Sequence, residues 1–360
     1  MTVIAVDDSS SRARPDWRPG GNGLFLLVFI AVLTVAALRF LRMSDLHRAF
    51  ELVRQVGWPI AIVLLPTGVA MGLDAKGWQL ILATVGNRVR WRALLPVRLA
   101  AESLVLSIPG GSLAAEAAKL SLLRASTGVP FVQGTASLGL AKASHIRGEA
   151  VYLAVAAVIA VGRHAGLGGH GRLLSVVATT GALTVALTSS ALFMLLRDVN
   201  RTFSLVERRA PKVVWVGRWL VRARGELGQL DRATQGFFAA STARRLACLA
   251  PFALEWFVEG LETWLILHCI GAAVSPGSAI VVDGVGSLLR AIAVFVPAGL
   301  GVQDTAQIAM LGIMGVPDAA VTGTALILVK RTKEVFWLFT GLAIGAGNRK
   351  AWLKLEVESR

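Results

Sequence analysis

Five basic residues carry the clearest binding chemistry in the sequence, because they interrupt segments that are otherwise apolar. They are Lys142, Arg147, Lys330, Arg331 and Lys333. The last three lie inside the apolar run 319–346, roughly 20 Å of helix from its end at ~1.5 Å per residue. Lys and Arg bind phosphate through charge-assisted hydrogen bonds, so this pattern predicts a site for an anionic lipid headgroup. The structural alternative is pairing of Lys330 with Glu334 or Asp304.

Acidic residues stand in the same apolar surroundings. Glu255, Glu259 and Glu262 have i, i+4, i+7 spacing, so they share one helix face. This face suits proton coupling, or pairing with Arg290 or with the lysine cluster, by which we mean Lys330, Arg331 and Lys333. A charge in a bilayer costs at least ~2.5–3.5 kcal/mol, so each needs a partner or water. The predicted buried network comprises Glu102, Glu116, Glu259, Glu262, Asp283, Arg290, Asp304 and Glu334. Glu102 and Arg290 have opposite charges at matching positions in the two halves of the sequence, so they are expected to pair, with Asp283 as the rival partner of Arg290.

Two Pro/Gly breaks separate pairs of short apolar runs. The first break lies between runs 94–108 and 113–123, and the second between runs 279–296 and 306–314. In each pair the second run is too short to cross ~30 Å of hydrocarbon, which favours re-entrant hairpins over two kinked helices. The predicted turn residues are Pro109, Gly110, Gly111, Pro297, Gly299 and Gly301. They either bring backbone N–H groups to an anion or only make tight turns.

The composition excludes an ordinary soluble protein. The chain has 360 residues, 55% of them hydrophobic and 16% charged, with mean hydropathy +0.64. Soluble chains are about a quarter charged. Longer apolar runs occupy 59–73, 132–161, 173–196, 246–270 and 319–346. These features predict an all-α polytopic membrane protein with about six full spans and two re-entrant helical hairpins.

The distribution of positive charge predicts the orientation. Segment 197–245 carries eleven Lys and Arg against four acids, and 74–98 is also basic, so both are expected in the cytoplasm. Both termini then become cytoplasmic, as residues 1–23 and 349–360, in the inner membrane. The run 24–38 is interpreted as an uncleaved anchor, with a signal peptide as the rival interpretation. The 197–245 loop is expected to lie on anionic lipid.

The second half of the sequence repeats features of the first at an offset near 188 residues. Pro109 aligns with Pro297, and Lys142 aligns with Lys330. Gly128-Val129-Pro130 likewise matches Gly315-Val316-Pro317. The half-repeats cover about 57–162 and 246–347. Three full spans between the hairpins would invert one half relative to the other, and inverted repeats are typical of transporters.

Other chemistries have little support in the sequence. Cys248 and Cys269 lie at opposite ends of one apolar run, too far apart for a disulfide. The five histidines have no metal-ligand spacing, and the glycine-rich segment 166–171 lacks the strand–helix context of a nucleotide loop. We therefore expect no cofactor, no metal, no nucleic-acid partner and no catalytic residues. An oligomer or a partner protein is possible.

Two motifs resemble signatures of a known membrane family. Residues 297–304, with sequence PAGLGVQD, and the following 315–317 resemble the C-terminal signature of the flippase-like family named for the transmembrane region of lysylphosphatidylglycerol synthase, the multiple peptide resistance factor. Ile108–Gly111, with Glu116 and Lys119 behind it, resembles the N-terminal signature. The resemblance covers about 24–348, and the residues of the two motifs are most similar to those of the hopanoid-locus branch.

The resemblance implies a lipid translocase whose re-entrant hairpins form a cavity for lipid headgroups. The family's soluble aminoacyl-transfer domain has no counterpart in this sequence, so we expect no synthase activity. The prediction is therefore an inner-membrane translocase that moves an amphipathic, anionic or modified lipid between leaflets. The alternative is a membrane enzyme or accessory subunit that acts in lipid or hopanoid biosynthesis without transport.

Overall fold

The chain folds into helices. The structure, a computed structural model, describes residues 45–107, 111–164, 168–199, 228–292 and 301–347, and these ranges contain no strand. The all-helical prediction is therefore confirmed. The described residues include the helices α2 (Leu46–Val56), η1 (Trp58–Val63), α3 (Leu64–Thr84), α4 (Trp91–Ser107), α5 (Gly111–Thr127), α6 (Phe131–His164), α7 (Gly168–Arg197), α10 (Thr242–Cys269), α11 (Pro276–Ile292), α12 (Val302–Ile313) and α13 (Ala319–Gly347). Residues 228–239 are helical as well.

Three helical segments of the described chain are long and apolar enough to cross a membrane. They are Trp58–Thr84, Phe131–Gly162 and Ser175–Arg197. Helices α10 and α13 have comparable lengths of 28 and 29 residues, but charged residues interrupt both. About 20 residues suffice to cross the hydrocarbon core, so α10 and α13 fit by length. The number of six spans stays a prediction, and the expected anchor at 24–38 lies outside the described residues.

The helix that contains the apolar run 59–73 extends beyond the end of that run. The helix does not stop at the first charge, because α3 continues to Thr84 and Asp74 lies halfway along it. Its carboxylate accepts a hydrogen bond from Arg98 of α4, with both side chains about six-sevenths buried. A guanidinium at this position compensates the carboxylate, so the helix tolerates the charge. The first part of the stretch 74–98 therefore continues α3, and the cytoplasmic placement of this stretch stays a prediction.

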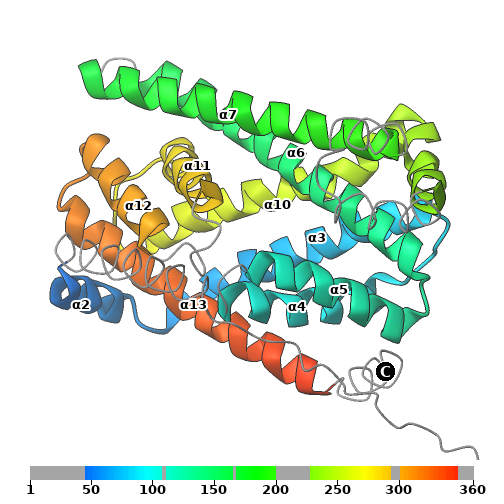
Figure 1. The fold of residues 1–360 in the computed structure, drawn as a ribbon. Coiled ribbons are helices and arrows are strands. Elements are labelled where there is room, and N and C mark those ends of the chain that lie inside the picture. The colour runs from blue at the N-terminus through cyan, green and yellow to red at the C-terminus, as the bar shows by residue number, and fades with distance from the viewer. Residues whose placement is uncertain (1–44, 108–110, 165–167, 200–227, 293–300, 348–360) are drawn as a thin grey trace, which may run out of the picture.

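Two groups of three helices follow the same order of short, short and long. They are α4, α5 and α6 in the first half and α11, α12 and α13 in the second (Figure 1). Gly128 and Gly315, the matched glycines before the long helices, have φ of 71° and 72°. Glycine adopts this left-handed conformation at helix ends without the strain of a side chain, and the proline that follows stops the old helix. The matched sequences thus make the same turn.

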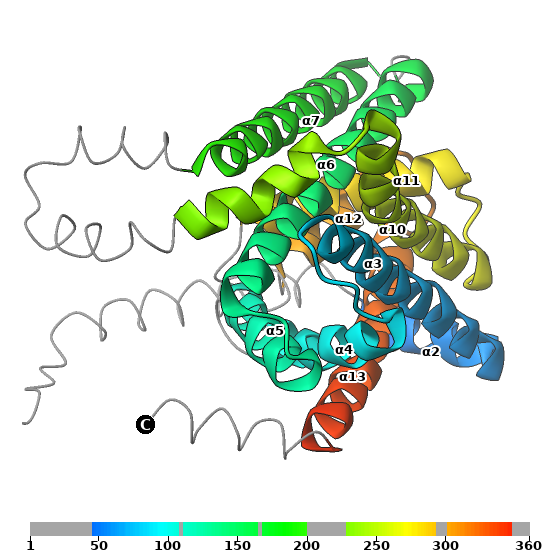
Figure 2. The ribbon, with the colours of Figure 1, turned by 90° about the vertical axis from the view of Figure 1, so that its right-hand side faces the viewer.

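The helices of the two groups pack against each other. The long helix α13 contacts α4 of the first group, and α6 contacts α11 of the second. Helices α3 and α10, which precede the two groups, lie side by side (Figures 1 and 2). Small residues allow close approach, as at Gly148 of α6, where an added Cβ would lie 2.7 Å from the backbone of Phe252. Helix α7 lies along α6 and leaves Leu183, Leu187 and Met194 exposed.

Candidate functional site

Ionisable side chains gather at mid-length of four helices. Asp74 lies halfway along α3, Glu255 halfway along α10 and Lys333 halfway along α13, while His145 lies near the middle of α6. Together with their partners they form what we call the charge network. Its described members are Asp74, Arg98, Glu102, His145, Glu255, Glu259, Glu262, Asp283, Arg290, Asp304, Lys330, Arg331, Lys333 and Glu334.

Lys330 binds a carboxylate on the neighbouring helix α11. Its Nζ lies 2.8 Å from Oδ1 of Asp283, and the two side chains are 12% and 5% exposed. Asp283 also accepts hydrogen bonds from the hydroxyls of Tyr152 at 3.1 Å and Thr263 at 2.9 Å. The carboxylate is therefore satisfied by donors from three other helices, α6, α10 and α13, so Asp283 links α11 to all three.

Arg331 joins α13 to the start of α12. Its guanidinium lies 2.5 Å from Oδ1 of Asp304 and 2.6 Å from Oε2 of Glu334. Asp304 also caps α12, because its Oδ2 accepts the N–H of Gly301 at 2.9 Å. A carboxylate at a helix N-terminus compensates the orphan N–H groups there. Asp304 thus couples the turn before α12 to the cation on α13.

Lys333 pairs with Glu262 of α10. The two side chains are 13% and 3% exposed, and the hydroxyl of Thr67 on α3 donates to the same carboxylate at 2.5 Å. One turn earlier on α10, Glu259 lies 3.7 Å from Arg290, whose guanidinium stands 5.8 Å from the Trp256 ring centre. Glutamates at i, i+4 and i+7 of α10 thus face different helices.

The first half contributes a compact group around Arg98. Its guanidinium contacts the carboxylates of both Asp74 and Glu102. On α5, Lys119 lies 3.1 Å from Glu116, whose side chain is 31% exposed. Nearby, the His145 Nδ1 lies 3.3 Å from Oε2 of Glu255. This group therefore holds more carboxylates than Lys and Arg side chains.

The structure places Lys142 and Arg147 apart from the α13 cations. Lys142 is exposed. Arg147 donates to the hydroxyls of Ser189 at 2.8 Å and Ser190 at 3.0 Å, and it lies over the Phe193 ring. These contacts are all with α7. The five basic residues therefore divide between two places: Lys330, Arg331 and Lys333 come together, while the other two lie on α6.

Several predicted pairings are wrong. Glu102 and Arg290 do not pair across the two halves, because Glu102 meets Arg98 one turn before it and Arg290 meets Glu259. Asp283, the rival partner of Arg290, pairs with Lys330. Asp304 and Glu334, which were expected to pair with Lys330, form ion pairs with Arg331 instead. The expected pairing of the α10 glutamates is confirmed for two residues, Glu259 with Arg290 and Glu262 with the lysine cluster.

The turn residues are only partly described. Pro109, Gly110, Pro297 and Gly299 lie outside the described residues, so re-entrance and anion binding there stay predictions. Gly111 begins α5, and an added Cβ would clash with the backbone of Leu104 on α4, so this glycine permits the close approach of α4 and α5. Gly301 has φ of 79° and precedes α12, a conformation that favours glycine.

Sequence reasoning missed Asp74, Arg98, Thr67 and Tyr152 as members of the site. In the sequence, Asp74 stands out only as the charge that follows the apolar run 59–73, and Arg98 only as a charge inside the run 94–108. A hydroxyl inside an apolar run gives no signal of its acceptor. A charge inside a run that is otherwise long enough to cross the bilayer was the usable signal for Asp74.

A cavity among the described helices differs from the expected polar one. It measures about 190 Å³ and lies between α4, α5 and α13. It is lined by Ala93, Pro96, Val97, Ala100, Leu122, Ser126 and Gly345. Because six of these seven residues have no polar side-chain atom, the cavity suits an acyl chain better than a headgroup.

Comparison with known proteins supports a membrane-lipid context. Residues 23–329 match the family model described as the lysylphosphatidylglycerol synthase TM region. The match covers most of the chain. It includes the charge network except for the four members on α13, which follow residue 329. No curated protein and no solved structure matches the chain.

Proposed function

Since the chain belongs to the family of the lysylphosphatidylglycerol synthase transmembrane region, an integral membrane family, we propose that it is a lipid translocase. It would move an amphipathic lipid with an anionic or modified headgroup between the leaflets of the inner membrane. The observation that carries this proposal is the charge network at mid-length of α3, α10 and α13. Ionisable residues within membrane helices are costly and mark substrate pathways.

The α13 cations suit exchange of one anion for another. Each of Lys330, Arg331 and Lys333 already binds a carboxylate, so a phosphate that replaces the carboxylate would keep the cation compensated. A headgroup passing through the network would therefore never leave a bare ammonium in hydrocarbon. The matched order of helices and the matched glycine turns support the inverted repeat, which we include in the proposal.

Lipid flipping by the purified protein in liposomes tests the proposal. Fluorescent lipids are followed by their loss of signal to an impermeant quencher. We compare the wild type with Lys330→Met and Asp304→Asn, and with Arg54→Met as a control from an exposed ion pair on α2. The two network variants should lose at least about tenfold in rate, and the control should not. Each variant must first show wild-type helicity and monodispersity.

Three results would separate the possibilities. Flipping that the network variants leave unchanged would keep the translocase but reject this site. No flipping by the wild type with any lipid would reject the proposal. Conversion of the supplied lipid into a new chemical species would instead favour the alternative, a membrane enzyme of lipid biosynthesis.

A further inference from the structure

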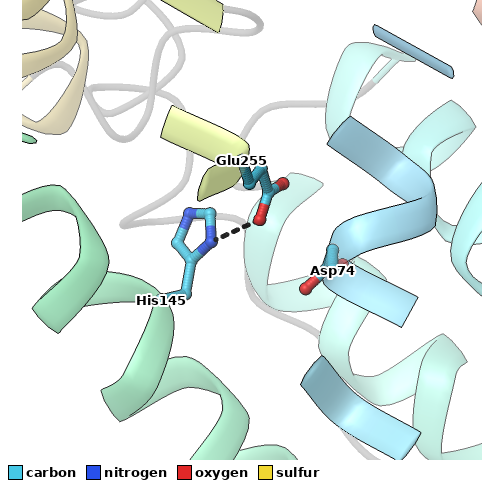
Figure 3. Close-up of side chains that lie close together, drawn as sticks. All are labelled: Asp74, His145 and Glu255. Carbon is cyan, nitrogen blue, oxygen red and sulfur yellow. Dashed lines mark hydrogen bonds and ion pairs between the residues drawn. The ribbon is translucent and has the colours of Figure 1, made fainter. Parts of the chain in front are cut away.

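Asp74, His145 and Glu255 bring three potential metal ligands together from three helices. One ligand atom from each lies within 4.8 Å of the other two (Figure 3). Glu255 is 2% exposed, and the side chains of Asp74 and His145 are 13% and 26% exposed. The residues are 71 and 110 positions apart along the chain, so no local ligand spacing marks them in the sequence.

Contacts with aromatic rings position the imidazole. The His145 ring centre lies 5.1 Å from that of Trp256 and 6.3 Å from that of Phe252, both on α10. The Trp256 Nε1 also donates to the His145 carbonyl at 3.2 Å. This packing directs Nδ1 toward Glu255, as Figure 3 shows. A ring held in this way loses little further freedom when it binds a ligand.

The repeat supplies an independent observation. The offset of 188 residues places Asp74 on Glu262, His145 on Lys333 and Glu255 on Thr67. The second set also meets in space, because Lys333 and Thr67 both bind Glu262. The two triads thus occupy matched positions on α3, α10 and the long helix of each half. In the second triad, an ammonium group fills the place that the imidazole takes in the first.

The charges of the two triads differ. One carboxylate and one ammonium compensate each other in the Thr67–Glu262–Lys333 triad. The first triad has two carboxylates and an imidazole. Arg98 contacts Oδ2 of Asp74, but it also serves Glu102, and among the described residues Glu255 has no Lys or Arg within ion-pair distance. The first triad therefore lacks a cation where its counterpart has one.

We propose that Asp74, His145 and Glu255 bind a divalent transition-metal ion. An imidazole with two carboxylates is a ligand set that suits Zn²⁺ and its neighbours. The 3.3 Å between His145 Nδ1 and Glu255 Oε2 equals the edge of a tetrahedron with bonds of about 2.0 Å. Arg98 contacts Oδ2 of Asp74, so Oδ1 is the oxygen that we assign as the third ligand. The three ligand atoms lie within 4.8 Å of one another, so the site must contract when it binds the ion.

The metal would link α3, α6 and α10 across the two halves. This role does not depend on the proposed translocase activity, because binding is an equilibrium property of the purified chain. Metal that binds only the folded protein also stabilises it, by an amount that grows with its concentration. Binding and stabilisation are thus two separate measurements of one site.

Equilibrium dialysis of the tag-free protein against Zn²⁺ tests the inference, with the visible absorption of bound Co²⁺ as a probe of coordination. The wild type should bind one ion per chain, with thermal stability that rises with metal concentration. Glu255→Gln should weaken binding at least about 100-fold. Glu51→Gln, from the exposed ion pair on α2, and His47→Gln on the same helix should bind as the wild type does.

His145→Lys is the decisive variant because it copies the second triad. Its ammonium should take the place of the metal, so the protein should fold without metal and lose the metal-dependent stabilisation. A wild type that binds no Zn²⁺ or Co²⁺ would overturn the inference. So would undiminished binding by both Glu255→Gln and His145→Lys, which would place the metal elsewhere.

Discussion

The pair of Lys333 and Glu262 predicts strong energetic coupling between α13 and α10. Both side chains are more than 85% buried, and the hydroxyl of Thr67 donates a second hydrogen bond to the Glu262 carboxylate. Lys333→Met removes the ammonium and leaves the carboxylate with a single hydroxyl donor. Breaking a buried pair from one side costs ~3–5 kcal/mol, since it leaves an uncompensated buried charge. Glu262→Met should cost a similar amount.

The double variant should recover most of this loss. Replacement of a buried pair by apolar residues of similar size is often neutral or stabilising. If each single variant loses about 3 kcal/mol and the double loses less than about 1, the coupling free energy is about 5 kcal/mol. That value is far above the ~0.2–1 kcal/mol of an exposed pair. Glu51 and Arg54 on α2, with side chains 36% and 69% exposed, provide this control cycle.

Unfolding by SDS from mixed micelles measures all four proteins of each cycle, with helicity and the fluorescence of the ten tryptophans as probes. The slopes of the transitions must agree before the free energies are compared. Additive losses in the Lys333 cycle, with the double as unstable as the sum of the singles, would refute the reasoning. They would mean that each side chain acts through separate packing and not through the pair.

Three further predictions use the same unfolding assay. Gly148→Ala should lower the free energy of unfolding by at least ~1–3 kcal/mol, because the new Cβ clashes with the backbone of Phe252. Gly162→Ala on the same helix has nothing within 4 Å of the new Cβ and should raise the free energy of unfolding by up to about 1 kcal/mol. Equal effects of the two substitutions would reject the close contact of α6 with α10 as the cause. Arg98→Met should lower the free energy of unfolding by ~3–5 kcal/mol, because two carboxylates lose their shared guanidinium. Addition of Asp74→Asn and Glu102→Gln to this variant should restore part of the lost stability. If no stability is restored, the packing of the Arg98 side chain matters more than its charge. Trp78→Phe should cost about 1 kcal/mol by losing the buried bond of 3.0 Å to Ser137, and no change would mean that this bond contributes nothing.

The sequence alone predicts the helices well, because their determinants are local. Apolar runs locate α6, α7, α10 and α13 to within a few residues, and proline or glycine marks the ends. The matched turns at Gly128 and Gly315 are equally local, since a left-handed residue followed by proline specifies the backbone directly. The prediction that Cys248 and Cys269 lie at opposite ends of one helix is confirmed for the same reason.

The pairing of charges is harder to predict, because it depends on helix rotation and distance. The repeat aligns Glu102 with Arg290 correctly as positions, but alignment does not make two residues neighbours. Arg98 lies four residues from Glu102 on the same helix, so it reaches the carboxylate without any tertiary contact. A cation nearby on the same helix therefore competes with cations on other helices for the same carboxylate. The sequence does not show how far apart residues on different helices lie in the folded protein.

The same geometry explains why α10 matters more than its apolar pattern indicates. Its three glutamates share one face, yet they pair with side chains of three different helices. Glu255 pairs with a residue of α6, Glu259 with one of α11 and Glu262 with one of α13. A helix can serve three partners in this way only if they cross it at successive turns. Two of these carboxylates also join the two halves, because Glu255 contacts His145 of α6 and Glu262 accepts a hydrogen bond from Thr67 of α3. A movement of one half against the other must then change the partners of Glu255 and Glu262. Loss of a partner without replacement costs several kcal/mol, so an ion or headgroup that replaces it determines which arrangements are accessible.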